Sequence, residues 1–207
     1  MEKFGEDILY HGTNVKFKKW KVGHQAHNKG YKAHSALFFT TDKEYAKGKE
    51  ENKNKYLASF KYKKEACKKI LDLRNCSDEV YENFRNHVIE KYPVINEYFG
   101  LISDSSLWKK FWQEGKTFKL VNPTSEQIKY HQSIFESKNK KDDFSKTFLQ
   151  EKTRELIEYW ILAARDLGYN ILICNEWNSF ELKEPKTSLF IAILDLNIIE
   201  DKPDWLN

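Results

Sequence analysis

The chain has 207 residues, of which 40% are hydrophobic and 32% are charged, and its formal net charge at pH 7 is +4. This length suits one domain with a substantial core, and the composition excludes a disordered or a fibrous chain. No apolar run approaches the roughly 20 residues that cross a bilayer, and the first residues, MEKFGEDILYHG, contain acids but no signal-peptide core. We therefore expect a cytoplasmic protein that does not bind a membrane.

Lysine carries most of the positive charge, because arginine occurs only as Arg74, Arg85, Arg154 and Arg165. Surfaces that read base sequence depend on arginine, whose planar fork pairs bidentately with guanine. The composition therefore favours a solvated, lysine-rich surface over sequence-specific recognition of nucleic acid.

The first 75 residues have the pattern of short strands and one helix. Strands rich in aliphatic and aromatic side chains are expected at residues 7–10, 36–40, 55–62 and 69–73. A capping box formed by Thr41 and Glu44 predicts the start of the short helix, TDKEYAKGKEE. Residues 16–35 are polar and contain glycine, so we expect a loop there.

Helical spacing dominates from residue 77 to residue 141, which we treat as a helical insert. Val80, Phe84 and Val88 recur at helical intervals in SDEVYENFRNHVIEKYP, and Pro93 ends that helix. Further helices are expected at residues 105–115 and 124–135.

The last 60 or so residues combine a long helix with strands. An apolar stripe on residues 145–168 predicts the helix, and Gly168 ends it as a C-cap glycine does. The stripe consists of Leu149, Leu156, Trp160, Ala163 and Leu167. Strands are expected at residues 169–174 and 188–196. Because no linker or repeat divides the chain, we expect one α+β domain: a strand-rich part (1–75), the helical insert, and the long helix with its closing strands (145–200).

Three segments carry the residue types of a ligand site, and they lie together if the terminal strands share one core. In YHGT, His11 stands beside Gly12, whose backbone amide no Cβ shields. ALFFTTDKEYA contributes Phe38 and Tyr45, and GYNILICNEW places Glu176 at the carboxyl end of a strand. The alternative interpretation of His11 and Gly12 is a simple turn signal.

Together the segments YHGTN, FKKW, ALFFTTDKEYA, LGYNILI and FIAILDL resemble the histidine–tyrosine–glutamate branch of the ADP-ribosyltransferases. The phage polyvalent-protein and anti-CRISPR transferases are similar members. The resemblance covers roughly the first 75 and the last 60 residues. It implies an α+β split β-sandwich with a helical insertion, in which NAD lies folded as a substrate in a cleft between two sheets.

The resemblance also implies roles for individual residues. The matching histidine bonds a ribose hydroxyl, a role that falls to His11, and the backbone of Gly12 would hold the nicotinamide carboxamide. Tyr45 and Phe38 would stack on the nicotinamide ring, because aromatic faces suit a planar cation. The other residues of the motif assigned to NAD binding are Tyr10 and Thr13.

Cleavage of the ribose–nicotinamide bond passes through an oxocarbenium-like state, which a carboxylate stabilises. Glu176 matches the acid of the small phage transferase, and Glu181 and Glu184 are its rivals. In the eukaryotic poly(ADP-ribose) polymerases the acid opens the strand that resembles FIAILDL, where this chain has Phe190 or, with slippage, Ser188. The catalytic set implied by the resemblance is His11, Tyr45 and Glu176.

We therefore expect a mono-ADP-ribosyltransferase that acts in the host cytosol as a phage or mobile-element effector, with a protein acceptor or, alternatively, nucleic acid. A non-catalytic binding module on the same fold stays open, as does RNA 2′-phosphotransfer, which normally needs several arginines. His24, His27 and His34 lie in a loop without supporting acids, so no metal site is expected. The sequence does not indicate an oligomeric state.

Overall fold

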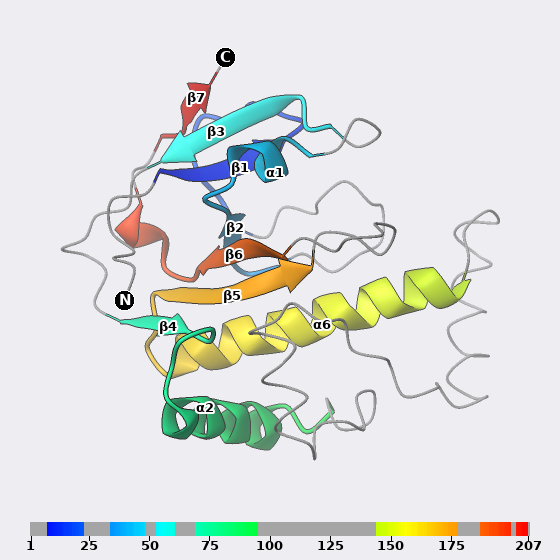
Figure 1. Cartoon of the computed structure of the whole chain (residues 1–207), viewed down its shortest axis with the longest axis vertical. Coiled ribbons are helices and arrows are strands. Elements are labelled where there is room, and N and C mark those ends of the chain that lie inside the picture. The colour runs from blue at the N-terminus through cyan, green and yellow to red at the C-terminus, as the bar shows by residue number, and fades with distance from the viewer. Residues whose placement is uncertain are drawn as a thin grey trace.

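The computed structural model describes residues 8–22, 34–48, 53–60, 69–94, 144–177, 187–199 and 202–206. These residues form three layers: a small sheet, a larger sheet, and a pair of helices (Figure 1). The α+β class expected from the sequence is confirmed. Apart from its first helix, the predicted helical insert lies outside the described residues.

Sheet A, the smaller sheet, has the strand order β1-β3-β7 and is antiparallel throughout. Its strands are β1 (Leu9–Thr13), β3 (Tyr56–Phe60) and β7 (Asp204–Leu206). The sequence pattern did not predict β7, because its three residues are too few to show a period.

Sheet B, the larger sheet, has the order β2-β6-β5-β4, with β4 parallel to β5 and the other pairs antiparallel. Its strands are β2 (Leu37–Phe39), β6 (Thr187–Ile193), β5 (Ile171–Trp177) and β4 (Ile70–Asp72). A 3₁₀ turn, Leu196–Ile198, follows β6. Strands from both ends of the chain thus pair in one sheet.

The space between the two sheets is filled by a hydrophobic core to which both contribute. Leu9 and Phe60 of sheet A and Phe39, Ile173 and Ile191 of sheet B belong to it, and each is at most 4% exposed. Along each of β2, β3, β5 and β6, members of this core are two positions apart, which is the alternation that directs one set of side chains to one face.

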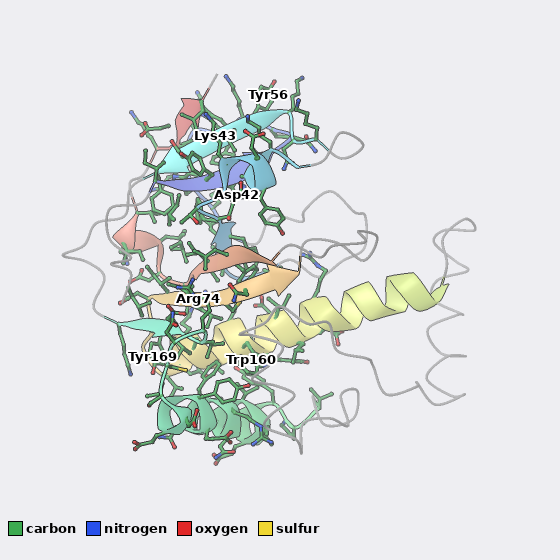
Figure 2. The ribbon with its side chains drawn as sticks, viewed as in Figure 1. Asp42, Lys43, Tyr56, Arg74, Trp160 and Tyr169 are labelled. Carbon is green, nitrogen blue, oxygen red and sulfur yellow. The ribbon has the colours of Figure 1, made fainter. Side chains whose placement is uncertain are left out.

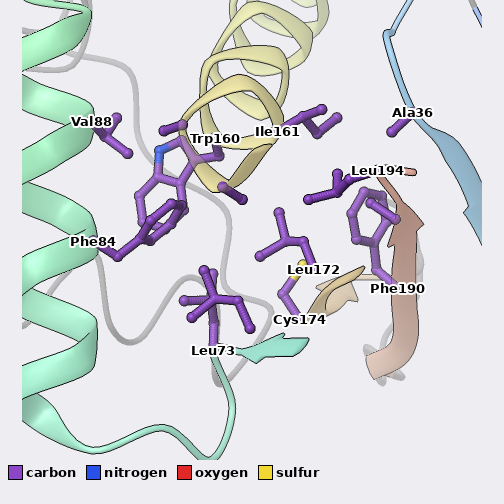
Figure 3. Packing of buried hydrophobic residues seen from close by; sticks show 14 of the residues in the cluster. Ala36, Leu73, Phe84, Val88, Trp160, Ile161, Leu172, Cys174, Phe190 and Leu194 are labelled. Atoms are coloured by element: carbon purple, nitrogen blue, oxygen red, sulfur yellow. The ribbon is translucent and has the colours of Figure 1, made fainter. Parts of the chain in front are cut away.

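The other face of sheet B is covered by helices α2 (Asp78–Lys91) and α6 (Phe144–Asp166). Trp160 of α6 is fully buried and meets Phe84 of α2 edge to face, with ring centroids 4.9 Å apart (Figure 3). Ser77 caps the start of α2 through the N–H of Val80.

The end of α6 is a Schellman motif centred on Gly168. Gly168 has a φ of 76°, its N–H donates to the carbonyl of Arg165, and the N–H of Tyr169 donates to the carbonyl of Ala164. The predicted C-cap glycine is therefore confirmed. In the described part of the chain, no helix is long and apolar enough to cross a membrane.

Two local predictions were wrong by one residue. Asp42, not Thr41, caps α1 (Lys43–Lys47), because its carboxylate accepts from the N–H groups of Glu44 and Tyr45. On α2 the buried stripe is Tyr81, Phe84 and Val88, while Val80 is 37% exposed. At about 100° per residue, position 81 lies within about 20° of position 88, whereas position 80 lies about 80° away.

We predict that Trp160→Ala lowers the free energy of unfolding by about 3–5 kcal/mol, because it leaves a cavity between α6, α2 and sheet B. Urea unfolding followed by circular dichroism measures this. Val80→Ala on the exposed side of α2 is the control and should change stability by less than about 0.5 kcal/mol. Equal effects of the two substitutions would contradict the packing described here.

Candidate functional site

Sheets A and B are joined by an isolated backbone bridge between β1 and the end of β2. The N–H of Tyr10 donates to the carbonyl of Thr40 at 2.8 Å, and the N–H of Thr40 donates to the carbonyl of Tyr10 at 3.1 Å. Beyond this bridge β1 pairs with β3 while β2 pairs with β6. The two sheets therefore separate next to His11, which follows the bridge directly. We call this place, where β1 and β2 stop pairing, the divide.

His11 lies inside β1, since the strand continues to Thr13; the expected end of this strand at residue 10 was wrong. Its Nδ1 donates to the carbonyl of Phe38 in sheet B at 2.8 Å. A carbonyl can only accept, so Nδ1 carries the proton and Nε2 of the neutral ring is the acceptor. The half-buried imidazole thus spans the divide between the sheets.

Aromatic rings hold the imidazole of His11 in place. Its ring centroid lies 5.6 Å from that of Trp20, 5.5 Å from that of Phe39 and 6.3 Å from that of Phe17. Trp20 is 3% exposed although it lies in the predicted polar loop. Sequence reasoning gave Trp20 no role of its own; its signal was the FKKW segment, two large aromatic residues within the lysine run KFKKWK.

Gly12 is covered by helix α1 at the position where a side chain would be, while its backbone polar groups point elsewhere. The backbone groups of Tyr10 point to Thr40, and alternation along an antiparallel strand turns the N–H and C=O of Gly12 to the same edge. A Cβ on Gly12 would lie 1.8 Å from the carbonyl oxygen of Ala46 and 2.3 Å from Nδ2 of Asn54. The missing side chain therefore admits helix α1, and the backbone amide and carbonyl face the divide.

Helix α1 carries Tyr45 and packs against β1. Asn54 holds the carboxyl end of this helix, because its Nδ2 donates to the carbonyl of Ala46 at 2.9 Å and its N–H donates to the carbonyl of Lys47 at 2.7 Å. Tyr45 is half-buried and directly precedes Ala46, the residue that covers Gly12. The structure thus brings the tyrosine helix beside the motif that contains His11.

Phe38 and Phe39 face opposite ways, as adjacent strand residues do. The Phe38 ring lies on the helix-covered face of sheet B, with centroids 4.9 Å from the His34 ring and 4.7 Å from the Phe190 ring. Phe39 turns its ring to His11. The structure therefore brings the carbonyl of Phe38, but the ring of Phe39, to the imidazole.

Glu176 lies near the end of β5, where its backbone is opposite Ser188 of β6. The ladder row that contains Phe39 continues through Ile191 to Ile173, three residues before Glu176. β1 and β5 both run from left to right in Figure 1, so their carboxyl ends point the same way. The side chain of Glu176, and the whole of residues 181 and 184, lie outside the described part.

Thr13 and Asn14 shape the turn that follows β1. The N–H of Val15 donates to the hydroxyl of Thr13 at 3.3 Å, and the N–H of Lys55 donates to Oδ1 of Asn14 at 2.9 Å. Thr13, like Tyr10, is half-buried. These bonds tie the end of β1 to the start of β3, close to His11.

A buried ionisable pair lies behind Phe38, and sequence reasoning missed it. His34 Nδ1 donates to Oε2 of Glu158 at 3.2 Å, and the N–H of Ser35 donates to the same oxygen at 2.9 Å. Arg165 adds a hydrogen bond to the hydroxyl of Ser35 at 3.1 Å. Burial raises the pKa of Glu158, but the hydrogen bonds from His34 and Ser35 outweigh it and hold the pKa below its usual range.

Within the described ranges no group of three or more metal-ligating residues is found, and His24 and His27 lie outside them. His34 instead links the segment before β2 to α6.

Comparisons of this chain with protein-family models, with curated proteins and with solved structures found no match. Its function is therefore inferred from the chemistry of the site itself. That site consists of the His11 imidazole, the Gly12 backbone and the aromatic side chains around the divide.

We predict that Glu158→Gln removes a pH-dependent part of the stability. A carboxyl whose folded pKa is lowered stabilises the protein above its unfolded pKa, and this contribution is lost as the pH falls through the folded pKa. The unfolding free energies of the wild type and the variant should differ most near neutral pH, and the difference should begin to shrink as the pH falls below the ordinary glutamate pKa of about 4.3. Urea titrations across pH measure this; a difference independent of pH would contradict it.

We predict that Gly12→Ala destabilises the protein by about 1–3 kcal/mol, because its Cβ displaces the carbonyl of Ala46. Gly168→Ala is the matched control, since its Cβ meets nothing within 4 Å and only the positive φ is strained. Amide NMR shifts distinguish the two, because Gly12→Ala should move the resonances of α1 and Gly168→Ala those at the end of α6. Unchanged α1 resonances in Gly12→Ala would exclude the steric explanation.

Proposed function

We propose that the chain is a NAD-dependent mono-ADP-ribosyltransferase on an ADP-ribosyltransferase-like split β-sandwich. The observation that carries the proposal is the parting of two sheets beside an imidazole whose Nδ1 is bonded across the divide to Phe38. The acceptor is a protein side chain or, alternatively, a nucleic acid. An effector of a phage or mobile element that acts in the host cytosol fits the resemblance of the sequence motifs.

The groups at the divide match the polar groups of nicotinamide riboside. A carboxamide offers both a donor and an acceptor, and Gly12 presents a backbone acceptor and donor on the edge that faces the divide. His11 Nε2 is suited to accept a hydrogen bond from a ribose hydroxyl, because Nδ1 is already committed to Phe38. The rings of Phe39 and Trp20 fix the imidazole orientation that this requires.

The reaction breaks the bond between ribose C1′ and the nicotinamide nitrogen, and the bonding electrons leave with nicotinamide. A nucleophile of the acceptor then bonds to C1′ and loses its proton. A carboxylate near the ribose stabilises the positive charge that develops and accepts that proton. Glu176 is assigned this role, with Glu181 and Glu184 as the alternatives, and Tyr45 on α1 stacks on the departing ring.

A second candidate is a binding module that holds NAD without turnover. It is favoured by the side chain at position 190, where the eukaryotic polymerases have their acid. Phe190 is 8% exposed and packs on Phe38 on the helix-covered face of sheet B. On this alternative the divide binds the dinucleotide, and no carboxylate acts on the ribose.

We predict that the purified protein releases nicotinamide from NAD and transfers labelled ADP-ribose to a component of cell extract. His11→Ala should lower nicotinamide release by about a hundredfold, because a polar contact to the reacting sugar is lost. Glu176→Gln should do the same while calorimetry still detects NAD binding. Glu79→Gln, at an exposed position in the first turn of α2, is the matched control and should leave the rate unchanged.

The outcomes separate the two candidates. NAD binding that depends on His11, without nicotinamide release, supports the binding module and excludes the enzyme. Release that persists in Glu176→Gln but is lost in Glu181→Gln or Glu184→Gln reassigns the carboxylate. A folded protein that neither binds nor cleaves NAD refutes both candidates.

A further inference from the structure

A continuous series of aromatic rings leads from the core between the sheets to the end of sheet A. The Trp20 ring centroid lies 4.9 Å from that of Phe17, Phe17 lies 5.1 Å from Trp205, and Trp205 lies 6.1 Å from Tyr56. Trp20 is buried, whereas the other three rings are half-buried. Figure 2 shows Tyr56 near the start of β3, on the side of the molecule away from α2.

Two lysines are held over the outer rings of this series. The Nζ of Lys16 lies 5.2 Å from the ring centroid of Tyr56 and 5.7 Å from that of Trp205, and the Nζ of Lys55 lies 5.3 Å from that of Tyr56. Lys55 is further fixed by its backbone bond to Asn14. The ammonium groups are therefore localised beside aromatic faces at one end of the sheet.

Charge is distributed unequally between the layers. Beyond Lys16, the same loop exposes Lys18, Lys19 and Lys21. Of the nearby acids, Asp42 is engaged as a helix cap and Glu44 as the partner of Lys47, while Asp204 of β7 is exposed. Helix α2, on the opposite side of the molecule, instead begins with the exposed acids Asp78 and Glu79. The described part of sheet A and its loop thus form a basic side of the molecule.

We propose that this end of sheet A, the surface formed by Lys16, Lys55, Tyr56 and Trp205, binds single-stranded nucleic acid. Ammonium groups pair with phosphates, and aromatic faces stack with bases, a combination that is tolerant of sequence. An acidic protein segment would use the lysines but not the rings. A duplex keeps its bases stacked inside and could not use the rings either.

The surface adjoins the divide between the sheets, because Phe17 and Trp20 belong to the aromatic series and also contact His11. If the chain is an ADP-ribosyltransferase, the surface identifies a nucleic acid as its acceptor. Binding itself does not depend on NAD, so the proposal can fail or succeed independently of the proposed function.

The test is fluorescence anisotropy with a labelled single strand of about 12 nucleotides, without NAD, at several salt concentrations. Lys16→Ala should weaken binding and make the slope of log K against log salt less steep by about 0.7. Lys91→Ala removes the same charge from α2, where Lys91 pairs with Asp166 at 3.5 Å, and should change neither. Equal effects of the two substitutions would overturn the proposal.

Stacking is tested with Tyr56→Leu, which should weaken binding about tenfold with an unchanged salt slope. Tyr92→Leu is the matched control, because Tyr92 is a half-buried ring stacked on Tyr159 in the helical layer. Circular dichroism verifies folding, and Lys16→Ala, at an exposed position, supplies the test if Tyr56→Leu does not fold. Tight binding of a duplex or of polyglutamate, or no binding of the single strand, would refute the proposal.

Discussion

The arrangement of this protein depends on the place where its two sheets are joined, which we call the joint: the Tyr10–Thr40 backbone bridge and the adjacent His11–Phe38 hydrogen bond. Tyr10 and Thr40 exchange both backbone hydrogen bonds, and one residue later His11 donates from Nδ1 to the carbonyl of Phe38. Both sheets direct apolar side chains into one shared core, which holds them face to face. The joint determines where the sheets part, and therefore which backbone and side-chain groups are presented together at the divide.

The joint is supported from the opposite face of sheet B. Strand β2 has only three residues, and the Phe38 ring on its far side packs against His34, which is bonded to Glu158 of α6. A buried carboxylate is stable only when it is paired and hydrogen-bonded, and Glu158 receives bonds from both His34 and Ser35. The helical layer and the site therefore share β2 as a common support.

The two functional proposals concern neighbouring sites on the same side of the protein. The two proposed ligands, a dinucleotide at the divide and a nucleic acid at the end of sheet A, are both anionic, and the exposed lysines of the loop after β1 would attract both. Aromatic side chains have different roles at the two sites: Trp20 and Phe39 contact the His11 imidazole, whereas Tyr56 and Trp205, beside Lys16, are the rings proposed to stack with bases. The acidic start of α2 marks the opposite side as unsuited to either ligand.

Local chemistry was readable from the sequence, because it depends on residues a few positions apart. The start of helical structure near residue 77, the end of α6 at Gly168 and most strands were predicted in this way. Contacts between distant residues were decided by the tertiary structure alone: His34 meets Glu158 across 124 positions, and His11 meets Phe38 across 27. A glycine in YHGT suggested a turn or a ligand contact, but its place in a strand under α1 follows from how the helix packs. Sequence thus specified the elements and the candidate residues, and the structure decided which faces of those residues meet, since no periodicity encodes contacts between separate elements.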